Sequence, residues 1–163
     1  MLATEAPLAV FDLQQAGEAQ WQALNSFQNR LQAEQWPEDS PRPLTMTIAE
    51  FRDRPACLDH QMWVIWDRTG TQIRAAGSLE VFNGSHNQHL AEFWIQVLPE
   101  ARRQGYARQL LRPIVAGARA ANRRLLLTWT SEAVPAGATF VRGLGGQPGL
   151  DEHTNQLELT DLR

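Results

Sequence analysis

Apolar residues recur along the chain with two different spacings, and these spacings predict alternating helices and strands. In residues 17–35, and again after Gly105, apolar side chains lie three and four residues apart, which is the period of one helix face. A second, short helix is expected to start at Thr47, because Glu50 three residues later completes a capping-box pattern. Shorter runs rich in aliphatic and aromatic residues predict strands at 8–13, 61–67, 72–82, 90–97, 124–130 and 156–160.

A short loop with two arginines joins the strand expected at 90–97 to the helix after Gly105. The first main-chain N–H groups of a helix have no carbonyl partner, and the helix dipole adds partial positive charge there, so an anion suits this junction. Gly105 lets a ligand approach the main chain closely, and Arg102, Arg103 and Arg108 can contact phosphate oxygens. The residues therefore predict a diphosphate site, and the alternative is an ordinary turn with solvated arginines.

The composition narrows the class of protein without deciding its function. A length of 163 residues predicts one domain, 1–163, and a single cysteine excludes an internal disulfide and a cysteine-based zinc site; no metal is expected. The net charge of −3 argues against a nucleic-acid partner. No apolar run approaches the ~20 residues of a membrane span, and no leader peptide is recognisable, so a cytoplasmic protein is expected.

The loop and the strand before it resemble a known family. The run VLPEARRQGYARQLL, preceded by LAEFWIQ, resembles the acyl-CoA signature of the GNAT superfamily of N-acetyltransferases, in which R/Q-x-x-G-x-G/A follows the fourth strand. Arg102, Gly105 and Ala107 stand at the key positions of that signature. Downstream, GATFVRGLG at 137–145 looks like the family's A-x-x-F-Y-x-x-x-G helix and turn. The resemblance covers residues 81–146, whereas the preceding part agrees only in the order of its elements.

The resemblance implies both a fold and a co-substrate. The fold would be a mixed α/β (α+β) domain of GNAT type, with a largely antiparallel central sheet of about seven strands and helices on both faces. Its fourth and fifth strands would run parallel and splay apart, and acetyl-CoA, the expected co-substrate, would enter between them. The residues expected to bind acetyl-CoA are Ile95, Gln96, Val97, Arg102, Arg103, Gln104, Gly105, Tyr106, Ala107 and Arg108.

The same resemblance, together with strand alternation, gives two candidate catalytic groups. The main-chain N–H of Val97 stands at the position that polarises the thioester carbonyl in the family. Glu92 is the candidate general base, because some family members have a glutamate there and alternation places it on one strand face with Trp94 and Gln96. The alternative for Glu92 is a structural pair with His89 or an arginine.

The activity that the resemblance implies is transfer of the acetyl group of acetyl-CoA to a primary amine of a small molecule or peptide, by direct nucleophilic attack. Many family members have a tyrosine after the phenylalanine of the last motif, where it acts as general acid, whereas here Val141 follows Phe140. This departure motivates the alternative function, a non-catalytic CoA-binding GNAT module with a regulatory or partner-dependent role. The sequence leaves the acceptor amine and a homodimer open.

Overall fold

The computed structural model describes residues 8–152 of the chain. Its contacts divide the chain after Trp129 into two compact units. The first unit holds the central sheet with the helices that pack on it, and the second holds the helix α4 (Pro135–Gly143). The strand and loop that carry the expected acetyl-CoA residues both lie in the first unit.

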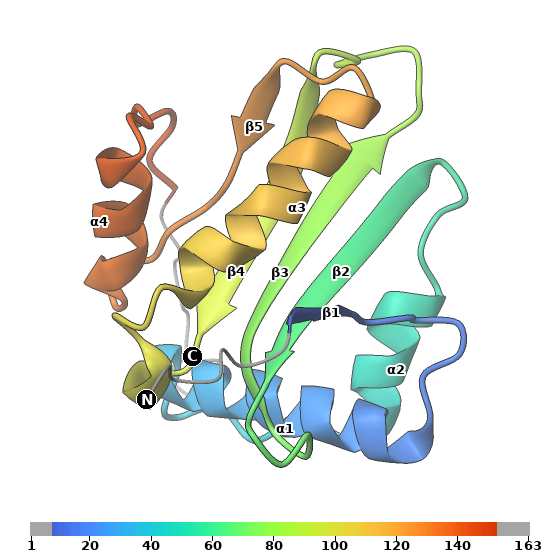
Figure 1. Ribbon diagram of the computed structural model, residues 1–163, viewed down its shortest axis with the longest axis vertical. Coiled ribbons are helices and arrows are strands. Elements are labelled where there is room, and N and C mark those ends of the chain that lie inside the picture. Colours follow the sequence, from blue (N-terminus) through green and yellow to red (C-terminus); the bar gives the residue numbers. More distant parts are fainter. Residues whose placement is uncertain (1–7, 153–163) are drawn as a thin grey trace, which may run out of the picture. The chain divides into compact units, whose positions relative to one another are not determined.

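A single mixed sheet forms the centre of the first unit, with its strands in the order of the chain (Figure 1). The strands are β1 (Leu8–Val10), β2 (Leu58–Trp66), β3 (Ile73–Phe82), β4 (Leu90–Val97) and β5 (Leu125–Leu127). Neighbouring strands are antiparallel except β4 and β5, which are parallel, as predicted. The sheet has five strands in the described residues, so the prediction of about seven is wrong for this part of the chain. After β5 the described chain forms α4 and irregular connections, and the strand expected at 156–160 lies outside the described residues.

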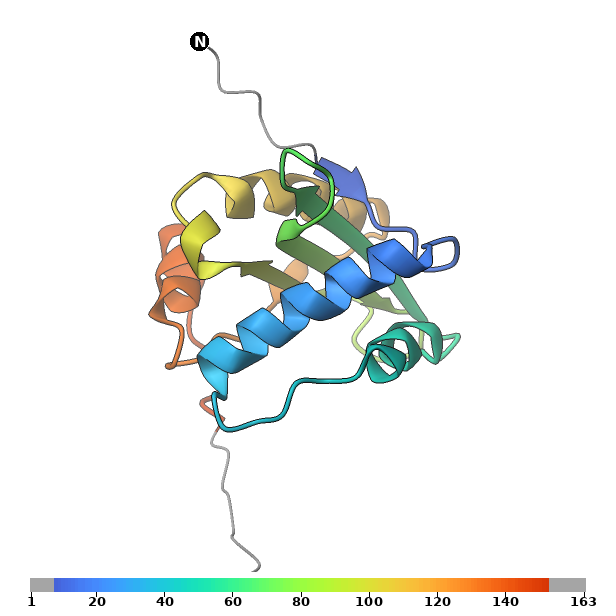
Figure 2. The same cartoon turned by 90° about the horizontal axis from the view of Figure 1, so that it is seen from below.

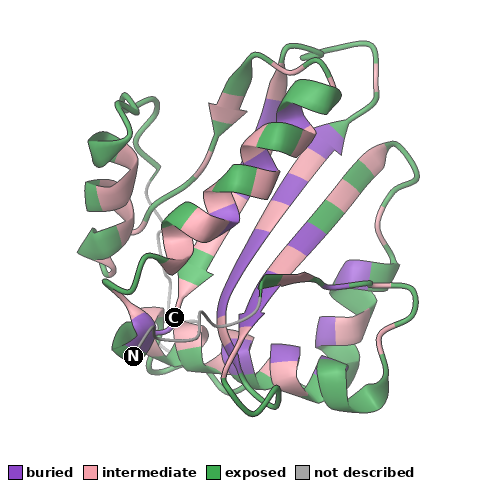
Figure 3. Ribbon diagram, in the orientation of Figure 1, coloured by how far each residue is buried: buried purple, intermediate pink, exposed green. Residues whose placement is uncertain are grey.

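Helices cover both faces of this sheet, as predicted. α1 (Glu18–Gln35) and α2 (Leu44–Arg52) lie on one face, and α3 (Tyr106–Ala120) lies on the other (Figure 2). The first face buries Trp21, Leu24, Phe27, Phe51, Met62, Val64 and Ala76. The second face buries Ile65, Ala75, Leu79, Val81, Phe93, Leu110, Ile114 and Ala118. The central strands carry more buried positions than the helices do, and the helices keep exposed residues on their outer sides (Figure 3).

α3 approaches the sheet closely at a glycine of β3. A Cβ added to Gly77 would lie 3.1 Å from Cδ1 of Ile114 and 3.2 Å from Cβ of Leu110. A glycine within a strand often marks the place where a helix packs close to the sheet, because glycine has no side chain between them. The 3₁₀ helix η1 (Pro99–Ala101) and a short loop connect β4 to α3. The packing therefore fixes the first turn of α3 near the C-terminal end of β4.

The start of α2 differs from the prediction. The helix begins at Leu44, so Thr47 and Glu50 do not form a capping box. Thr47 is buried within the helix, where its hydroxyl accepts a hydrogen bond from Nδ2 of Asn25 at 3.0 Å. Glu50 forms an ion pair with Arg42 instead. A tertiary contact with α1 therefore uses the hydroxyl that the local pattern had assigned to a cap.

Candidate functional site

The ladder between β4 and β5 is short and leaves part of β4 open. Its last pair joins Glu92 to Leu127, and the pairs before it are Leu90 with Leu125 and Ala91 with Leu126. Beyond Glu92, no strand in the described part of the chain lies along this edge of β4. The ladder of the parallel pair therefore ends before the part of β4 at which the resemblance implied an entry for acetyl-CoA.

The open edge of β4 presents the main chain of Ile95 and Val97. Leu98 donates its N–H to the carbonyl of Arg74 at 3.1 Å, so the even-numbered residues of β4 pair with β3. Main-chain groups alternate sides along a strand, so Ile95 and Val97 direct theirs away from β3. Gln96 faces β3, and only its exposed side chain is left for a ligand.

The two main-chain groups of Val97 have different environments. Its carbonyl accepts a hydrogen bond from Nε of Arg102 at 3.2 Å. Its N–H has no acceptor among the described residues. The N–H of Val97, which is the expected oxyanion donor, is therefore free on the open edge of the strand. The hydrogen bond from Arg102 to the carbonyl of the same residue holds the main chain in place there.

The loop after η1 leaves several main-chain N–H groups without acceptors. Within the described residues, the N–H groups of 103–107 donate to no oxygen, and the first helical bond runs from Arg108 to the carbonyl of Gly105 at 3.1 Å. Gly105 has a φ of 83°, and no heavy atom lies within 4 Å of a Cβ built on it. Arg103 also has a positive φ, 63°. Successive free N–H groups at a helix N-terminus make an anion site, and they fit the diphosphate of CoA.

The arginines of the loop fall into two groups. Arg102 donates from Nη1 and Nη2 to the two carboxylate oxygens of Glu34, at 2.7 and 2.5 Å, so its guanidinium is already occupied by a residue of α1. Arg103 and Arg108 are exposed and form no ion pair within the described residues. The structure therefore leaves two of the three expected arginines available to phosphate oxygens.

The remaining loop residues contribute mainly through their main chain. The Gln104 side chain donates to the carbonyl of Glu100 at 3.2 Å. The Tyr106 ring is half-buried and packs against the hydrophobic clusters on both faces of the sheet. Ala107 is also half-buried. Each of these residues keeps a free N–H, so the loop offers ligand contacts even where its side chains point to other partners.

Glu92 lies on the sheet face that α1 and α2 cover, in a cross-strand row with Glu80 of β3 and His60 of β2. It forms no hydrogen bond or ion pair with any described residue, so neither His89 nor an arginine is its partner there. Burial, with a further contribution from the negative charge of Glu80, raises the pKa of Glu92 above its ordinary value of 4.5. Glu92 is thus a half-buried carboxylate with an increased affinity for a proton.

A group of charges that was not predicted from the sequence surrounds Glu80. Arg54 forms an ion pair with Glu80, and Nδ1 of His60 lies 3.1 Å from Oε1 of Glu80 and 2.9 Å from Nη1 of Arg54. Burial alone would raise the pKa of Glu80, but the hydrogen bonds to His60 and Arg54 lower it overall. Glu80 therefore keeps its negative charge beside Glu92. Alternation indicates which face each side chain takes, but only the strand register, which no local pattern gives, places them opposite each other.

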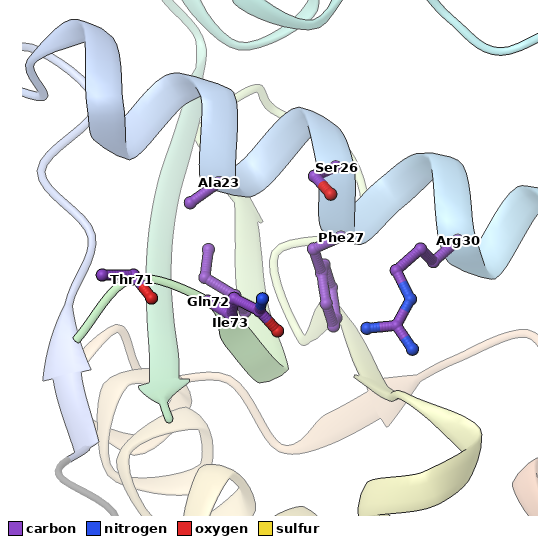
Figure 4. A pocket seen from close by; sticks show the side chains of 7 residues that line it. All are labelled: Ala23, Ser26, Phe27, Arg30, Thr71, Gln72 and Ile73. Atoms are coloured by element: carbon purple, nitrogen blue, oxygen red, sulfur yellow. The ribbon is translucent and has the colours of Figure 1, made fainter. Parts of the chain in front are cut away.

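The first unit also has a pocket and a groove that are lined by residues outside the candidate site. A pocket of about 120 Å³ between α1 and the turn before β3 is lined by Ala23, Ser26, Phe27, Arg30, Thr71, Gln72 and Ile73 (Figure 4). Its one charged side chain, Arg30, pairs with Glu100 at 2.6 Å. A groove of about 650 Å³ lies beside β1, the start of β2 and the end of α2. Glu92 and residues 102–108 line neither hollow.

The second unit carries Val141, at the position where the resemblance led us to look for a tyrosine. Val141 is half-buried in α4 and directly follows Phe140. Its side chain has no proton to donate, so this position supplies no general acid.

Among the described residues, no group of three or more His, Cys, Asp or Glu side chains could hold a metal ion. No described helix has both the length and the apolar character that crossing a bilayer requires.

Comparisons with known proteins bear on the fold and on the loop. A Trypanosoma brucei acetyltransferase shares 18% identity over 93% of this chain and 99% of its own, with a TM-score of 0.59. Glucosamine-6-phosphate N-acetyltransferase from Arabidopsis thaliana shares 11% identity over 93% of this chain and 98% of its own, with a TM-score of 0.62. The aminoglycoside N-acetyltransferase AAC(6')-Iy in complex with CoA shares 13% identity over 96% of this chain and 99% of its own, with a TM-score of 0.65. A search of curated protein sequences gave no significant match.

These likenesses at low identity show the fold. The sequence itself matches the acetyltransferase (GNAT) family over residues 21–145, which includes β4, the loop and α3. The match extends over most of the chain and agrees with the parallel β4 and β5 pair and with the free N–H groups ahead of α3. The chain therefore belongs to the GNAT family of acetyltransferases.

Proposed function

We propose that this protein is an N-acetyltransferase that moves the acetyl group of acetyl-CoA to a primary amine of a small molecule or peptide. The observation that carries the proposal is the series of acceptor-free N–H groups at 103–107, one short segment away from the open edge of β4. An anion-binding turn suits the diphosphate of acetyl-CoA. An open strand edge suits its amide-containing pantetheine arm, which can pair with the strand main chain.

In this proposal the loop residues bind the diphosphate in two ways. The N–H groups of 103–107 donate to its oxygens, and the exposed guanidinium groups of Arg103 and Arg108 add charge-assisted hydrogen bonds. Arg102 acts indirectly, because its bond to Glu34 holds the loop against the end of α1. This assignment keeps Arg102 in the site as a positioning residue.

The open edge of β4 would orient the acyl end. Ile95 offers main-chain groups to the pantetheine arm, and Gln96 can contribute only its side chain. When bound, acetyl-CoA supplies an activated thioester carbonyl to the reaction. The Val97 N–H donates to that carbonyl oxygen as negative charge develops on it, an effect of about 3 kcal/mol for one well-placed donor.

Glu92 would remove the proton that makes an amine unreactive. An alkylammonium group has a pKa of about 10, so little of it is nucleophilic near neutral pH without a base. The raised pKa of Glu92, caused by burial and by Glu80, makes this carboxylate a better proton acceptor than a solvated one. Because Val141 offers no phenol, the departing thiol, with a pKa of about 8.5, takes its proton from water or leaves as thiolate.

Release of free thiol from acetyl-CoA across a panel of primary amines tests this function. We expect turnover with some amines, and we expect Glu92→Gln to lower it by about a hundredfold or more, the usual range for losing a general base. The thermal stabilisation by acetyl-CoA should be the same in both proteins, because Glu92 is not among the residues of the loop. Stabilisation without thiol release for any amine would favour the non-catalytic module, and unchanged turnover in Glu92→Gln would exclude Glu92 as the base.

The proposal extends to the setting of the enzyme. Its one cysteine, Cys57, is free and exposed, which is typical of a compartment that keeps thiols reduced, so we place the protein in the cytoplasm. We also treat the two compact units as one acetyltransferase domain, because the family match crosses their boundary.

A further inference from the structure

Two tryptophans meet at the point where β4 and β5 separate. Trp94 lies two residues beyond Glu92 on β4, and Trp129 lies two residues beyond Leu127, the β5 partner of Glu92. Their rings stack, with centroids 5.6 Å apart and an interplanar angle of 10°. Side chains alternate along a strand, so Trp94 shares the sheet face of Glu92. The stack therefore lies where the ladder ends, beside the proposed base.

The neighbours of this stack are one small residue and one charged residue, and one of its two rings is exposed. The cross-strand partner of Trp94 is Ser78, a small residue whose side chain forms no hydrogen bond within the described part of the chain. Trp129 is 46% exposed. The negative charge of Glu80 is matched by Arg54, whereas that of Glu92 is matched by no described residue. The patch thus combines flat apolar surface with one uncompensated carboxylate.

This combination favours one chemical class of acceptor. The face of an indole ring attracts cations and packs well against apolar or aromatic groups. An uncompensated carboxylate attracts an ammonium group and repels an acidic one. We propose that Trp94 and Trp129 select the acceptor of the proposed reaction, a cationic amine whose apolar body lies against the indole pair while its amino group lies at Glu92. The inference rests on the proposed function and adds the substrate class to it.

Acceptor kinetics with three small amines test the inference. Phenethylamine carries an aromatic body, n-propylamine is a short apolar amine, and taurine carries a sulfonate. With acetyl-CoA as donor, we expect kcat/KM to be about tenfold higher for phenethylamine than for n-propylamine, and lowest for taurine. Trp129→Ala should lower the value for phenethylamine about five- to tenfold and leave that for n-propylamine nearly unchanged.

Two further variants separate selection from general damage. Trp129→Phe keeps an aromatic plane and should retain most of the preference for phenethylamine. Leu125→Ala removes a β5 side chain of similar exposure, 45%, at the paired end of the strand, and should change neither amine. The inference would be overturned if Trp129→Ala lowered kcat/KM equally for both amines or did not lower it at all. It would also be overturned if taurine were used as readily as n-propylamine.

A binding measurement keeps this test separate from that of the proposed function. Saturation-transfer NMR can follow phenethylamine binding to the CoA-bound protein without any turnover. Binding that Trp129→Ala abolishes, with no thiol release in any variant, would sustain the amine site and defeat acetyl transfer. Thiol release from acetyl-CoA with n-propylamine as acceptor, together with no phenethylamine binding, would defeat the amine selection and sustain acetyl transfer.

Discussion

The folded protein holds the side chain of Glu92 in surroundings that disfavour its negative charge. Burial and the charge of Glu80 raise its pKa above 4.5, so the folded protein binds this proton more tightly than the unfolded chain does. Stability therefore falls as the pH rises from 4.5 through the folded-state pKa. We expect Glu92→Gln to be more stable than the wild-type protein at neutral pH, and the difference to shrink toward zero below pH 4.5.

Urea unfolding across this pH range measures the effect, and Glu100 provides a control of opposite sign. A hydrogen bond from its own main-chain N–H, aided by Arg30, lowers the pKa of Glu100. Glu100→Gln should therefore lose stability at neutral pH, where Glu92→Gln gains it. A Glu92→Gln protein less stable than the wild type at neutral pH would contradict the prediction. A gain in stability with a loss of turnover would identify a carboxylate retained for function.

At the scale of elements, two ion pairs join α1 to the segment that follows β4. The side chains of Glu34 and Arg102 are 24% and 23% exposed, and those of Arg30 and Glu100 are 45% and 43% exposed. The first pair is bidentate and better shielded from water, so it should contribute more to stability. We expect Glu34→Gln to lower the free energy of unfolding by about 1–3 kcal/mol. Glu100→Gln should cost less than about 1 kcal/mol. Chemical denaturation of both variants measures the two losses in free energy of unfolding. Equal losses would show that the difference in burial does not make one ion pair more stabilising than the other.

Elements with a strong local pattern were predictable from the sequence. The strand expected at 90–97 agrees with β4 at both ends, and the helix expected at 17–35 agrees with α1 to within one residue. Both carry a sustained apolar period that burial then enforces. α2 was placed too late, because the hydroxyl of Thr47 binds α1 and not the start of its own helix. Local patterns fail where a polar side chain is used by a distant partner.

The candidate site shows the same division. The free N–H groups around Gly105 follow from a helix start, which the sequence indicates directly. The occupied guanidinium of Arg102 depends on Glu34, and the charge beside Glu92 depends on Glu80. These partners come from other elements, so only the packing and the strand register bring them to the site. The roles assigned to the site residues stay predictions until acetyl-CoA binding and turnover are measured.

At the scale of the whole molecule, acetyl-CoA binding should stabilise the fold, because a ligand that binds only the folded state shifts the unfolding equilibrium. At a concentration one hundred times Kd, the gain is about 2.7 kcal/mol. Gly105→Glu should abolish this gain by placing a negative side chain beside the N–H groups that bind the diphosphate.

Gly70→Glu is a matched control, because both glycines have a positive φ, 83° for Gly105 and 71° for Gly70, and neither has a heavy atom within 4 Å of an added Cβ. The two variants should thus lose similar stability from backbone strain, about 1–2 kcal/mol, and differ only in their response to acetyl-CoA. Differential scanning fluorimetry with and without acetyl-CoA measures both effects, and a full ligand shift in Gly105→Glu would remove the loop from the binding site.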